Sequence, residues 1–459
     1  EHLEIRSYLD EIENLQKSLH QAPHRNKDLN SSSSPASNAN ETTPPISRIS
    51  KTEAFLEWAA QVGIVADGVT VSPAVGYGGG VGLKATAQLV EGKTAVCVPR
   101  RAMLTSDKAL KSSELKTAVE KDPLLRGMTN VTLALLLLCE KLKGSGSYWS
   151  KYIDFLPDSY NTALYYTVEE IKLLKGSASL EEALKMFRNI SRQFSYFHQI
   201  LGANTRLFIK SPLTLKTLTF DAYRWAVSTV MTRINFVPRE DDPYANIPAL
   251  IPYLDLANHA EGKCTPEFDK AIQSACIKTD RSYNPGDQIC IFYGERNNGD
   301  FLLHDGFVPA GRNSRNYLKV QLGLSKGDKL LAEKVEKLAQ FQLDAHEEFC
   351  LDYGSLNKQI LVFARVFVAG PEVIGGVKPL DEGENGRKAV EFLINRFKLL
   401  INGYSQELEL FLKDKPAKEP DENDQSTNKK FIALLINSEK ELLTSAIAEL
   451  EGILKSFPA

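Results

Sequence analysis

The chain has 459 residues, of which 43% are hydrophobic and 25% are charged, and its formal net charge at pH 7 is −3. This balance is ordinary for a globular protein and excludes an overall basic field for non-specific nucleic-acid binding. The longest apolar run, VTLALLLLC at 131–139, is shorter than the roughly 20 residues that span a bilayer, so it predicts a buried helix and no membrane span.

The first 50 residues predict a helix followed by a linker. Residues 1–25 carry a narrow apolar seam at helical spacing, made by Ile5, Tyr8, Ile12, Leu15 and Leu19. This amphipathic helix either docks on a partner or on its own protein, or is a marginal helix in solvent, and the pattern favours neither. Residues 26–50 are rich in Ser, Asn, Pro and Thr and predict a disordered linker. Because the chain begins at Glu1 without Met, we expect an N-terminal piece outside it.

Beyond the linker the pattern is that of an α+β protein. β-rich runs divided by Gly clusters fill residues 64–104, helical patterns fill about 106–245, and short strands return at 248–294. Each β part needs the other to bury its apolar residues. We therefore predict one split β-rich domain at 51–310 with a helical insertion, followed by a helical C-terminal domain at 311–459.

The glycine-rich segment VGYGGGVGLKA (75–85) invites comparison with phosphate-binding loops, but it lacks their details. Lys84 is not followed by Ser or Thr, and a GxGxxG pattern starting at Gly76 and Gly78 has Val81 in place of its last glycine. The following residues predict a strand, so no helix N-terminus would face a phosphate. Two interpretations stay open: a β-turn with glycines at positive φ, or a close approach of backbone to a flat or carboxylate-bearing ligand.

The six cysteines do not predict a metal site. No CxxC or CxC pair is present, and structural zinc sites usually need such pairs. Four lie in apolar or strand-like runs, where a thiol is most simply a buried side chain, so a reducing compartment fits. The six are Cys97, Cys139, Cys264, Cys276, Cys290 and Cys350.

Two polar pairs stand at the ends of apolar runs in the second β part. Asn258 and His259 follow the run in IPYLDLANHAEG, and Tyr293 precedes a glycine in GDQICIFYG. Taken singly, the first is usually a polar turn and the second an aromatic side chain at the edge of the core. No second His or Cys has metal-ligand spacing to His259, and no GxSxG motif presents a nucleophile.

Together and in this order, these segments resemble the SET domain of protein methyltransferases. That domain has a G-x-G turn, an N-H-[SA] motif and a G-E-x-[IL]-x-x-x-Y-G motif. Here the three are found as Gly80-Val81-Gly82-Leu83, Asn258-His259-Ala260 and the segment from Gly286-Asp287-Gln288-Ile289 to Tyr293-Gly294.

The helical regions are similar to one branch of that family, the branch of Rubisco large-subunit lysine methyltransferase. The similar segments are SYWSKYIDFLPDSYNTALYYTVEEIKLLKGS (147–177), MTRINF (231–236) and GERNNGDFLLHDGFVP (294–309). The resemblance covers about residues 50–459. It implies a SET domain followed by a helical Rubisco-methyltransferase-type substrate-binding domain.

In that family the cofactor is S-adenosylmethionine, and the resemblance implies a role for each matching residue. The turn formed by Gly80, Val81, Gly82 and Leu83 would lie under the methionine part of the cofactor. Asn258 and His259 would hold its amino or adenine groups. Arg233 would pair with its carboxylate. Tyr293 would stand at the channel that joins cofactor and substrate, and it is the residue we expect to be catalytic.

Two features depart from the family pattern. The turn carries no charged side chain beside its glycines, and Asp305 stands where the lysine methyltransferases of the family often have an aromatic residue. The acidic side chain would face either a cationic amine or solvent. A histidine-methylating relative also lacks that aromatic residue, so the change loosens the assignment of lysine as the methyl acceptor.

On the altered turn and the N-terminal helix and linker, the chain resembles most the plastid transcription-associated members of this branch. That implies a chloroplast location (stroma and nucleoid), with a transit peptide outside this chain. It also implies association with the plastid-encoded RNA polymerase, with or without protein-lysine methyltransferase activity. The alternative is an active Rubisco- or aldolase-type protein-lysine methyltransferase of the stroma. We expect protein partners and no direct sequence-specific contact with nucleic acid.

Overall fold

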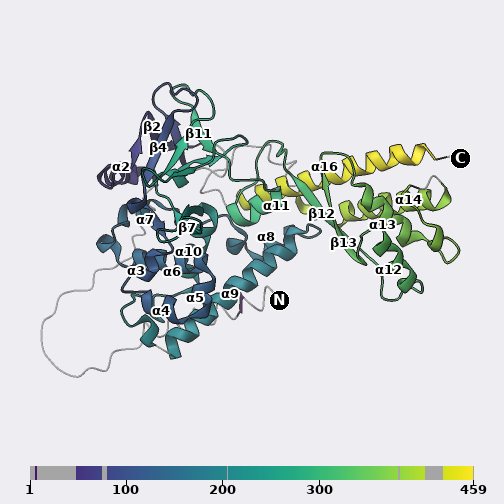
Figure 1. The fold of residues 1–459 in the computed structure, drawn as a ribbon, viewed down its shortest axis with the longest axis horizontal. Coiled ribbons are helices and arrows are strands. Elements are labelled where there is room, and N and C mark those ends of the chain that lie inside the picture. Colours follow the sequence, from purple (N-terminus) through teal and green to yellow (C-terminus); the bar gives the residue numbers. More distant parts are fainter. Residues whose placement is uncertain are drawn as a thin grey trace, which may run out of the picture. The chain divides into compact units, whose positions relative to one another are not determined.

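The architecture is seen in a computed structural model that describes residues 6–7, 48–74, 80–203, 205–380, 383–408 and 427–457. Nearly all of the N-terminal helix and linker expected at 1–50, and the start of the glycine-rich turn, lie outside the described residues. The described residues fall into two compact units, which are drawn in Figure 1. The first contains the residues up to Tyr160 and Met186–Tyr293, and the second contains Asn161–Lys185 and the chain from Gly294 onward.

Three small sheets make up the β part of the first unit within the described chain. One has the order β1 (Val65–Ala66), β4 (Thr94–Pro99), β10 (Ser274–Lys278) and β9 (Glu267–Asp269). The second has the order β2 (Val69–Pro73), β3 (Val81–Ala85), β11 (Gln288–Ile291) and β8 (Asn258–His259). The third has the order β5 (Leu104–Thr105), β7 (Asn246–Leu250) and β6 (Asn235–Pro238).

Early and late strands pair directly, which confirms that the two β parts come together. β10 lies antiparallel to β4, and β11 lies antiparallel to β3 with Gln288 opposite Lys84 and Ile289 opposite Leu83. Leu83 and Ile289 are both fully buried, so the apolar residues of one part are covered by those of the other. In Figure 1, β2, β4 and β11 lie together at one end of the unit although β11 follows the helical insertion.

Helices fill the insertion of the first unit. The apolar run at 131–139 lies in α6, and Val131 to Glu140 are buried, as expected. α6 packs against α10, whose first turn is capped by the Thr219 hydroxyl accepting a hydrogen bond from the Ala222 amide. The helices are α3 (Lys108–Lys111), α4 (Lys116–Lys121), α5 (Pro123–Gly127), α6 (Thr129–Leu142), α7 (Ser150–Phe155), α9 (Ser179–Ala203), of which residues up to Lys185 belong to the second unit, and α10 (Phe220–Arg233), and α2 (Thr52–Gln61) precedes them.

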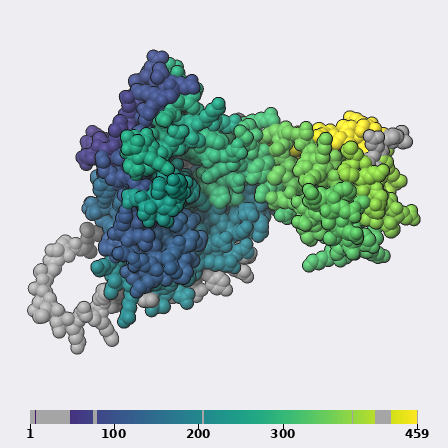
Figure 2. All heavy atoms as spheres, in the orientation of Figure 1, coloured from purple at the N-terminus to yellow at the C-terminus, as the bar shows by residue number. Residues whose placement is uncertain are grey.

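The second unit is less purely helical than expected. β12 (Tyr317–Gly323) and β13 (His346–Asp352) form an antiparallel pair in which buried and exposed side chains alternate. The helix α16 packs on α14 and contacts both strands, and Figure 2 shows its yellow atoms against the green atoms of this unit. The helices are α8 (Val168–Leu173), α11 (Asn298–Asp300), the π-helix η7 (Phe301–Asp305), α12 (Leu331–Gln340), α13 (Lys358–Val368), α14 (Glu384–Gly403) and α16 (Thr427–Lys455).

The helices can be compared with the expectation of no membrane span, and short 3-10 turns connect the elements. Among the described helices, none is both long and apolar enough to span a bilayer. The 3-10 turns are η1 (Arg48–Lys51), η2 (Arg100–Ala102), η3 (Gly144–Gly146), η4 (Ala163–Tyr165), η5 (Thr205–Phe208), η6 (Leu254–Leu256) and η8 (Ile374–Gly376).

Two cysteines depart from the expected buried thiols. Cys97 and Cys276 lie directly opposite each other in β4 and β10, with Cα atoms 4.3 Å apart, and form a disulfide. Their sequence separation of 179 residues offered no signal for this pair. Cys139 and Cys264 are buried free thiols, as expected.

Candidate functional site

The two polar pairs singled out in the sequence meet in the first unit. β8 lies parallel to β11, with Asn258 opposite Cys290 and His259 opposite Ile291. The buried ring of His259 accepts a hydrogen bond at Nδ1 from the Tyr293 amide, at 3.2 Å, and its centroid is 5.3 Å from that of the tyrosine ring. His259 therefore fixes the backbone at the end of β11, a structural task that fits neither an acid–base nor a metal-binding role.

The Asn258 side chain lies over the glycine-rich turn. Its Nδ2 donates to Gln288 Oε1 at 2.7 Å and approaches the Val81 carbonyl oxygen at 3.5 Å. A Cβ atom on Gly82 would lie 2.7 Å from Gln288 Oε1 and 2.8 Å from Asn258 Nδ2, both closer than real Cβ contacts. Any side chain at position 82 would collide with the hydrogen-bonded amides of Asn258 and Gln288, so this contact needs glycine here. Both donated bonds use the amide nitrogen, which leaves the Asn258 oxygen as an acceptor.

The hydroxyl of Tyr293 is held by the chain segment that precedes Asn258. It donates a hydrogen bond to the Ala257 carbonyl oxygen at 2.8 Å. Because the proton is directed to that carbonyl, the phenolic oxygen presents its lone pairs elsewhere as an acceptor. Tyr293 is partly exposed, so this acceptor is placed on a half-buried side chain.

A buried ionic cluster supports the same segment from below the surface. Arg233, at the end of α10, donates from one terminal nitrogen to the Asp255 carbonyl oxygen at 2.6 Å, and the same nitrogen is 3.7 Å from the Asp255 carboxylate. The fully buried Tyr152 hydroxyl donates to the other carboxylate oxygen. Asp255 lies in η6, directly before the Asn-His pair, so the cluster ties that segment to α7 and α10.

The environment of Asp255 shifts its titration. Burial raises the pKa of this carboxyl to about 6, while Arg233 and the Tyr152 hydrogen bond act in the opposite direction. Two polar atoms of the cluster, Arg233 Nε and Asp255 Oδ1, are buried without a hydrogen-bond partner. The Tyr160 hydroxyl also interacts with the guanidinium, so the unused donor of Arg233 is its Nε atom.

The residues predicted in the glycine-rich turn differ in which of their atoms a ligand could reach. Gly80 has a φ of +98°, the left-handed region that favours glycine, whereas the side chains of Val81 and Leu83 are buried in the core. Only the backbone of those two residues can face a ligand. The sequence analysis missed Tyr152, Asp255 and Gln288.

An acidic residue inside the apolar run IPYLDLANH is the one signal that could have found Asp255, because a buried carboxylate needs partners.

Asp305, in the second unit, does not face solvent. Its side chain is 4% exposed and forms an ion pair with Arg296. Burial raises the pKa of the carboxyl to about 6 despite that partner. The solvent alternative is therefore wrong. Within the described ranges, no group of three or more His, Cys, Asp or Glu side chains is arranged to hold a metal ion.

Comparison with known protein families identifies two domains in the chain. The SET domain family matches residues 80–294, which include every site residue predicted from the sequence. The family described as Rubisco LSMT substrate-binding matches residues 325–443, within the second unit.

Two solved structures with the same fold have ligands bound. The SET domain of LSMT bound to lysine and AdoHcy has a TM-score of 0.67 and 21% identity, covering 88% of this chain and 91% of that one. Rubisco LSMT bound to AdoMet has a TM-score of 0.65 and 20% identity with the same coverage. At this identity the likeness shows the fold alone.

Curated relatives are more similar in sequence. An actin-histidine N-methyltransferase of Danio rerio is 34% identical over 416 residues, which is 86% of this chain and 67% of that protein. The actin-histidine N-methyltransferase of Homo sapiens is 32% identical over 414 residues, with the same shares. The chain spans about two thirds of the length of these two relatives. It belongs to the family of SET-domain proteins with a Rubisco LSMT substrate-binding domain, which includes the actin-histidine N-methyltransferases.

Proposed function

We propose that the chain is an S-adenosylmethionine-dependent protein methyltransferase whose site is formed by Gly82, Arg233, Asn258 and Tyr293. The observation that carries the proposal is the meeting of Tyr293 with the Asn258 segment, where the hydroxyl proton is committed to the Ala257 carbonyl. Support comes from relatives that are protein methyltransferases and from solved neighbours described as bound to AdoMet or AdoHcy.

The residues present fit such a cofactor. Arg233 Nε is a buried donor without a partner, which suits a carboxylate. The oxygen of Asn258 remains an acceptor, which suits an ammonium group. Gly82 has no side chain that would collide with the Asn258 amide above it. The cofactor would supply a methyl group made electrophilic by its sulfonium centre.

The chain's own part in the reaction is alignment. The phenolic oxygen of Tyr293 can accept weak C–H···O contacts from a polarised methyl group because its proton is engaged by Ala257. His259 fixes the Tyr293 backbone, and the Asp255 cluster fixes the segment that carries Asn258. Rate enhancement then comes mainly from holding donor and acceptor in line.

We further propose that the acceptor is a histidine side chain of an actin-like protein. The relatives that are 32–34% identical are actin-histidine methyltransferases, whereas the solved neighbour described with lysine is 21% identical. An imidazole with a pKa near 6.5 is already largely neutral at pH 8, so it can attack without a base, whereas a lysine ammonium must first lose a proton. A lysine acceptor, the original expectation, is the competing outcome of the same assay.

The test is methyl transfer from labelled S-adenosylmethionine to purified actin and to a protein extract, with the modified residue located by mass spectrometry. We expect label on a histidine, and a rate reduced about 10²-fold in Tyr293→Phe, the size expected when reacting groups lose alignment. Tyr244→Phe, which changes a 93% exposed tyrosine of the same unit, is the matched control. Label on lysine alone would contradict the histidine assignment, and transfer to no protein would overturn the function.

The chloroplast location and the association with the plastid-encoded RNA polymerase are separate proposals that rest on the sequence resemblance alone. They are tested by imaging the tagged full-length protein in plant cells and by purifying it with its partners. A tag found outside plastids would refute the location. Purification without polymerase subunits would refute the association and leave the methyltransferase proposal intact.

A further inference from the structure

A second cavity lies wholly within the second unit, apart from the residues assigned to methyl transfer. Its volume is about 610 Å³, within the range of small-ligand sites. It is lined by the turn before α9 and the start of α9, by α11 and η7, by β12 and β13, and by α14 and α16.

Glu439 of α16 lines this cavity with an incompletely satisfied carboxylate. The residue is 5% exposed, and its Oε1 accepts a hydrogen bond from the Ser177 hydroxyl at 2.8 Å. Its Oε2 is buried and makes no hydrogen bond of good geometry, although the Tyr404 hydroxyl is near enough to stabilise the carboxylate. Burial raises the pKa of Glu439 to about 7, and it also raises the pKa of the adjacent Tyr404, with Glu439 adding to that rise. A buried carboxylate oxygen that lacks a donor destabilises the fold unless a ligand supplies the missing hydrogen bond.

A buried donor lines the same cavity. Asn316 Oδ1 accepts a hydrogen bond from the Asn298 amide at 2.9 Å, so the orientation of the side-chain amide is settled. Its Nδ2 is buried without a hydrogen-bond partner. The cavity therefore offers one unused acceptor, on Glu439, and one unused donor, on Asn316.

The charges around the cavity are mainly acidic. Lys319 is already paired with Glu348 at 2.9 Å, and burial lowers the pKa of His304, which favours its neutral form. The acidic lining residues are Glu181, Glu182, Asp300, Glu348 and Glu439, and the basic ones are Lys319, Arg396 and His304. A ligand that enters this cavity meets a field that favours positive charge.

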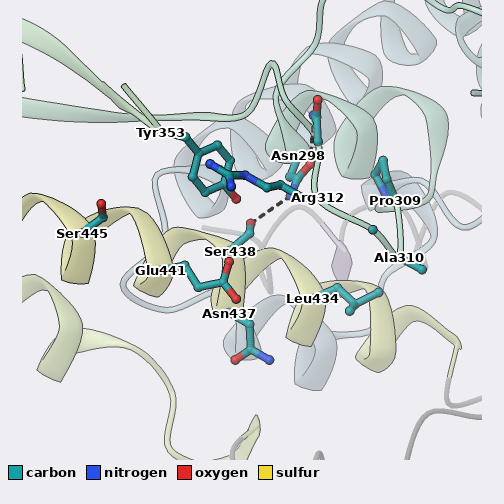
Figure 3. Close-up of a pocket in the computed structure, with 12 residues that line it drawn as sticks. Asn298, Pro309, Ala310, Arg312, Tyr353, Leu434, Asn437, Ser438, Glu441 and Ser445 are labelled. Carbon is teal, nitrogen blue, oxygen red and sulfur yellow. Dashed lines mark hydrogen bonds between the residues drawn. The ribbon is translucent and has the colours of Figure 1, made fainter. Parts of the chain in front are cut away.

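A neighbouring cavity of about 490 Å³ on another face of α16 shows the contrast. There Asn298 donates to the Ser438 hydroxyl at 2.9 Å and accepts from Asn313 at 3.1 Å, so these buried groups satisfy one another. Figure 3 shows Arg312 beside the ring of Tyr353, 4.0 Å from its centroid, above the helix. Among the described residues that line that cavity, no side chain is buried without a hydrogen-bond partner, whereas the Glu439 cavity retains two such groups.

We propose that the Glu439 cavity binds a protonated amine or guanidinium group, with Glu439 as its buried anion and Asn316 as donor to a neighbouring oxygen of the ligand. A lysine or arginine side chain of a protein segment offers both groups, since a backbone carbonyl accompanies the cation. A free alkylamine offers the cation alone. The site is independent of methyl transfer, so either proposal can fail without the other.

The full chain is titrated with two probes, 1,4-diaminobutane and the capped peptide acetyl-Gly-Lys-Gly-amide, and binding is followed by saturation-transfer NMR. We expect both to bind, with dissociation constants of about 1 mM or below, the scale that ligands of this size allow. The same peptide with an acetylated lysine should not bind. Binding of the diamine but not of the peptide would support the cation site and identify a free amine as the source.

The decisive variants lie two residues apart on α16. Glu439→Gln keeps the shape of the side chain and should weaken both probes about 10-fold or more, because it removes a charge-assisted hydrogen bond. Glu441→Gln makes the same change at an exposed position that lines the other cavity, and should leave binding unchanged.

If Glu439→Gln fails to fold, the exposed Glu182→Lys at the cavity rim serves instead and should weaken both probes several-fold. The proposal is overturned if neither probe binds at a concentration 10-fold above the expected dissociation constant. It is also overturned if wild type and a folded Glu439→Gln bind the probes equally. Methyl transfer by Glu439→Gln should equal that of wild type.

Discussion

Each unit buries a carboxylate, and the two have different partners. Asp255, whose side chain is 1% exposed, has the Arg233 guanidinium and the Tyr152 hydroxyl beside it. Glu439, which is 5% exposed, has the Ser177 and Tyr404 hydroxyls beside it and forms no ion pair among the described residues. Burial raises the pKa of the first to about 6 and of the second to about 7.

The difference separates two uses of a buried acid. A buried acid with a cation beside it, as at Asp255, holds one segment in place, here the segment that carries Asn258. A buried acid without a cation gives up stability in the empty protein, and a ligand can recover it. The predictions below either break the Asp255 pair or test the missing partner of Glu439.

The largest effect is expected from Arg233→Met. This change leaves the Asp255 charge buried and unpaired, so it should lower the free energy of unfolding by about 3–5 kcal/mol. Tryptophan fluorescence during urea unfolding measures it, because Trp58, Trp149 and Trp225 all lie in the first unit. The double variant Arg233→Met with Asp255→Asn should recover most of the loss. A single variant as stable as wild type would show that the pair is not essential.

A smaller, pH-dependent effect is expected from Glu439→Gln. The carboxyl titrates near pH 4.5 when unfolded and near pH 7 when folded, so wild-type stability falls as the pH rises from 4.5 to 7. The Glu439→Gln variant has no carboxyl at this position, so its stability does not fall for this reason as the pH rises. Its advantage over wild type should be about 2–3 kcal/mol larger at pH 8 than at pH 5.

Hydrogen exchange of the α16 amides at the two pH values measures this advantage. Glu441→Gln, the exposed neighbour, should show no such pH dependence. An advantage that is the same at both pH values would mean that Glu439 is compensated in the native protein.

The smallest effect on stability is expected from Gly82→Ala. The added Cβ must displace Asn258 or Gln288, at a cost of about 1–3 kcal/mol typical of overpacking. Affinity for S-adenosylmethionine should fall about 10-fold, because the moved amide no longer presents its oxygen. Calorimetry measures the affinity, and Gly127→Ala, where a Cβ meets nothing within 4 Å, is the control. Unchanged affinity would place the cofactor elsewhere.

Much of the architecture could be predicted because it follows from local pattern and motif order. The buried helix at 131–139 was visible in its composition, and the two β parts had to pair to bury residues such as Leu83 and Ile289. Asn258 and Tyr293 could be linked through the resemblance to SET domains. The antiparallel pair of β12 and β13 was missed although YLKVQLG alternates, because helical patterns surround it.

The supporting contacts could not be predicted, for a physical reason. Tyr152 and Asp255 are 103 residues apart, and Ser177 and Glu439 are 262 apart, so no spacing rule joins them. Glu439 stands in an amphipathic helix where a charged residue ordinarily faces solvent. It is buried only because the chain around Ser177 and Tyr404 covers that face of α16. Such burial is a property of the tertiary fold.

The central claim is that the Asn258 and Tyr293 segment binds S-adenosylmethionine. Equilibrium dialysis with the labelled cofactor tests it most directly, comparing wild type with Asn258→Ala and with Glu439→Gln. We predict about one cofactor bound per chain for wild type and for Glu439→Gln, and a large loss of affinity for Asn258→Ala. Binding that is absent in wild type, or equal in wild type and Asn258→Ala, would contradict the claim.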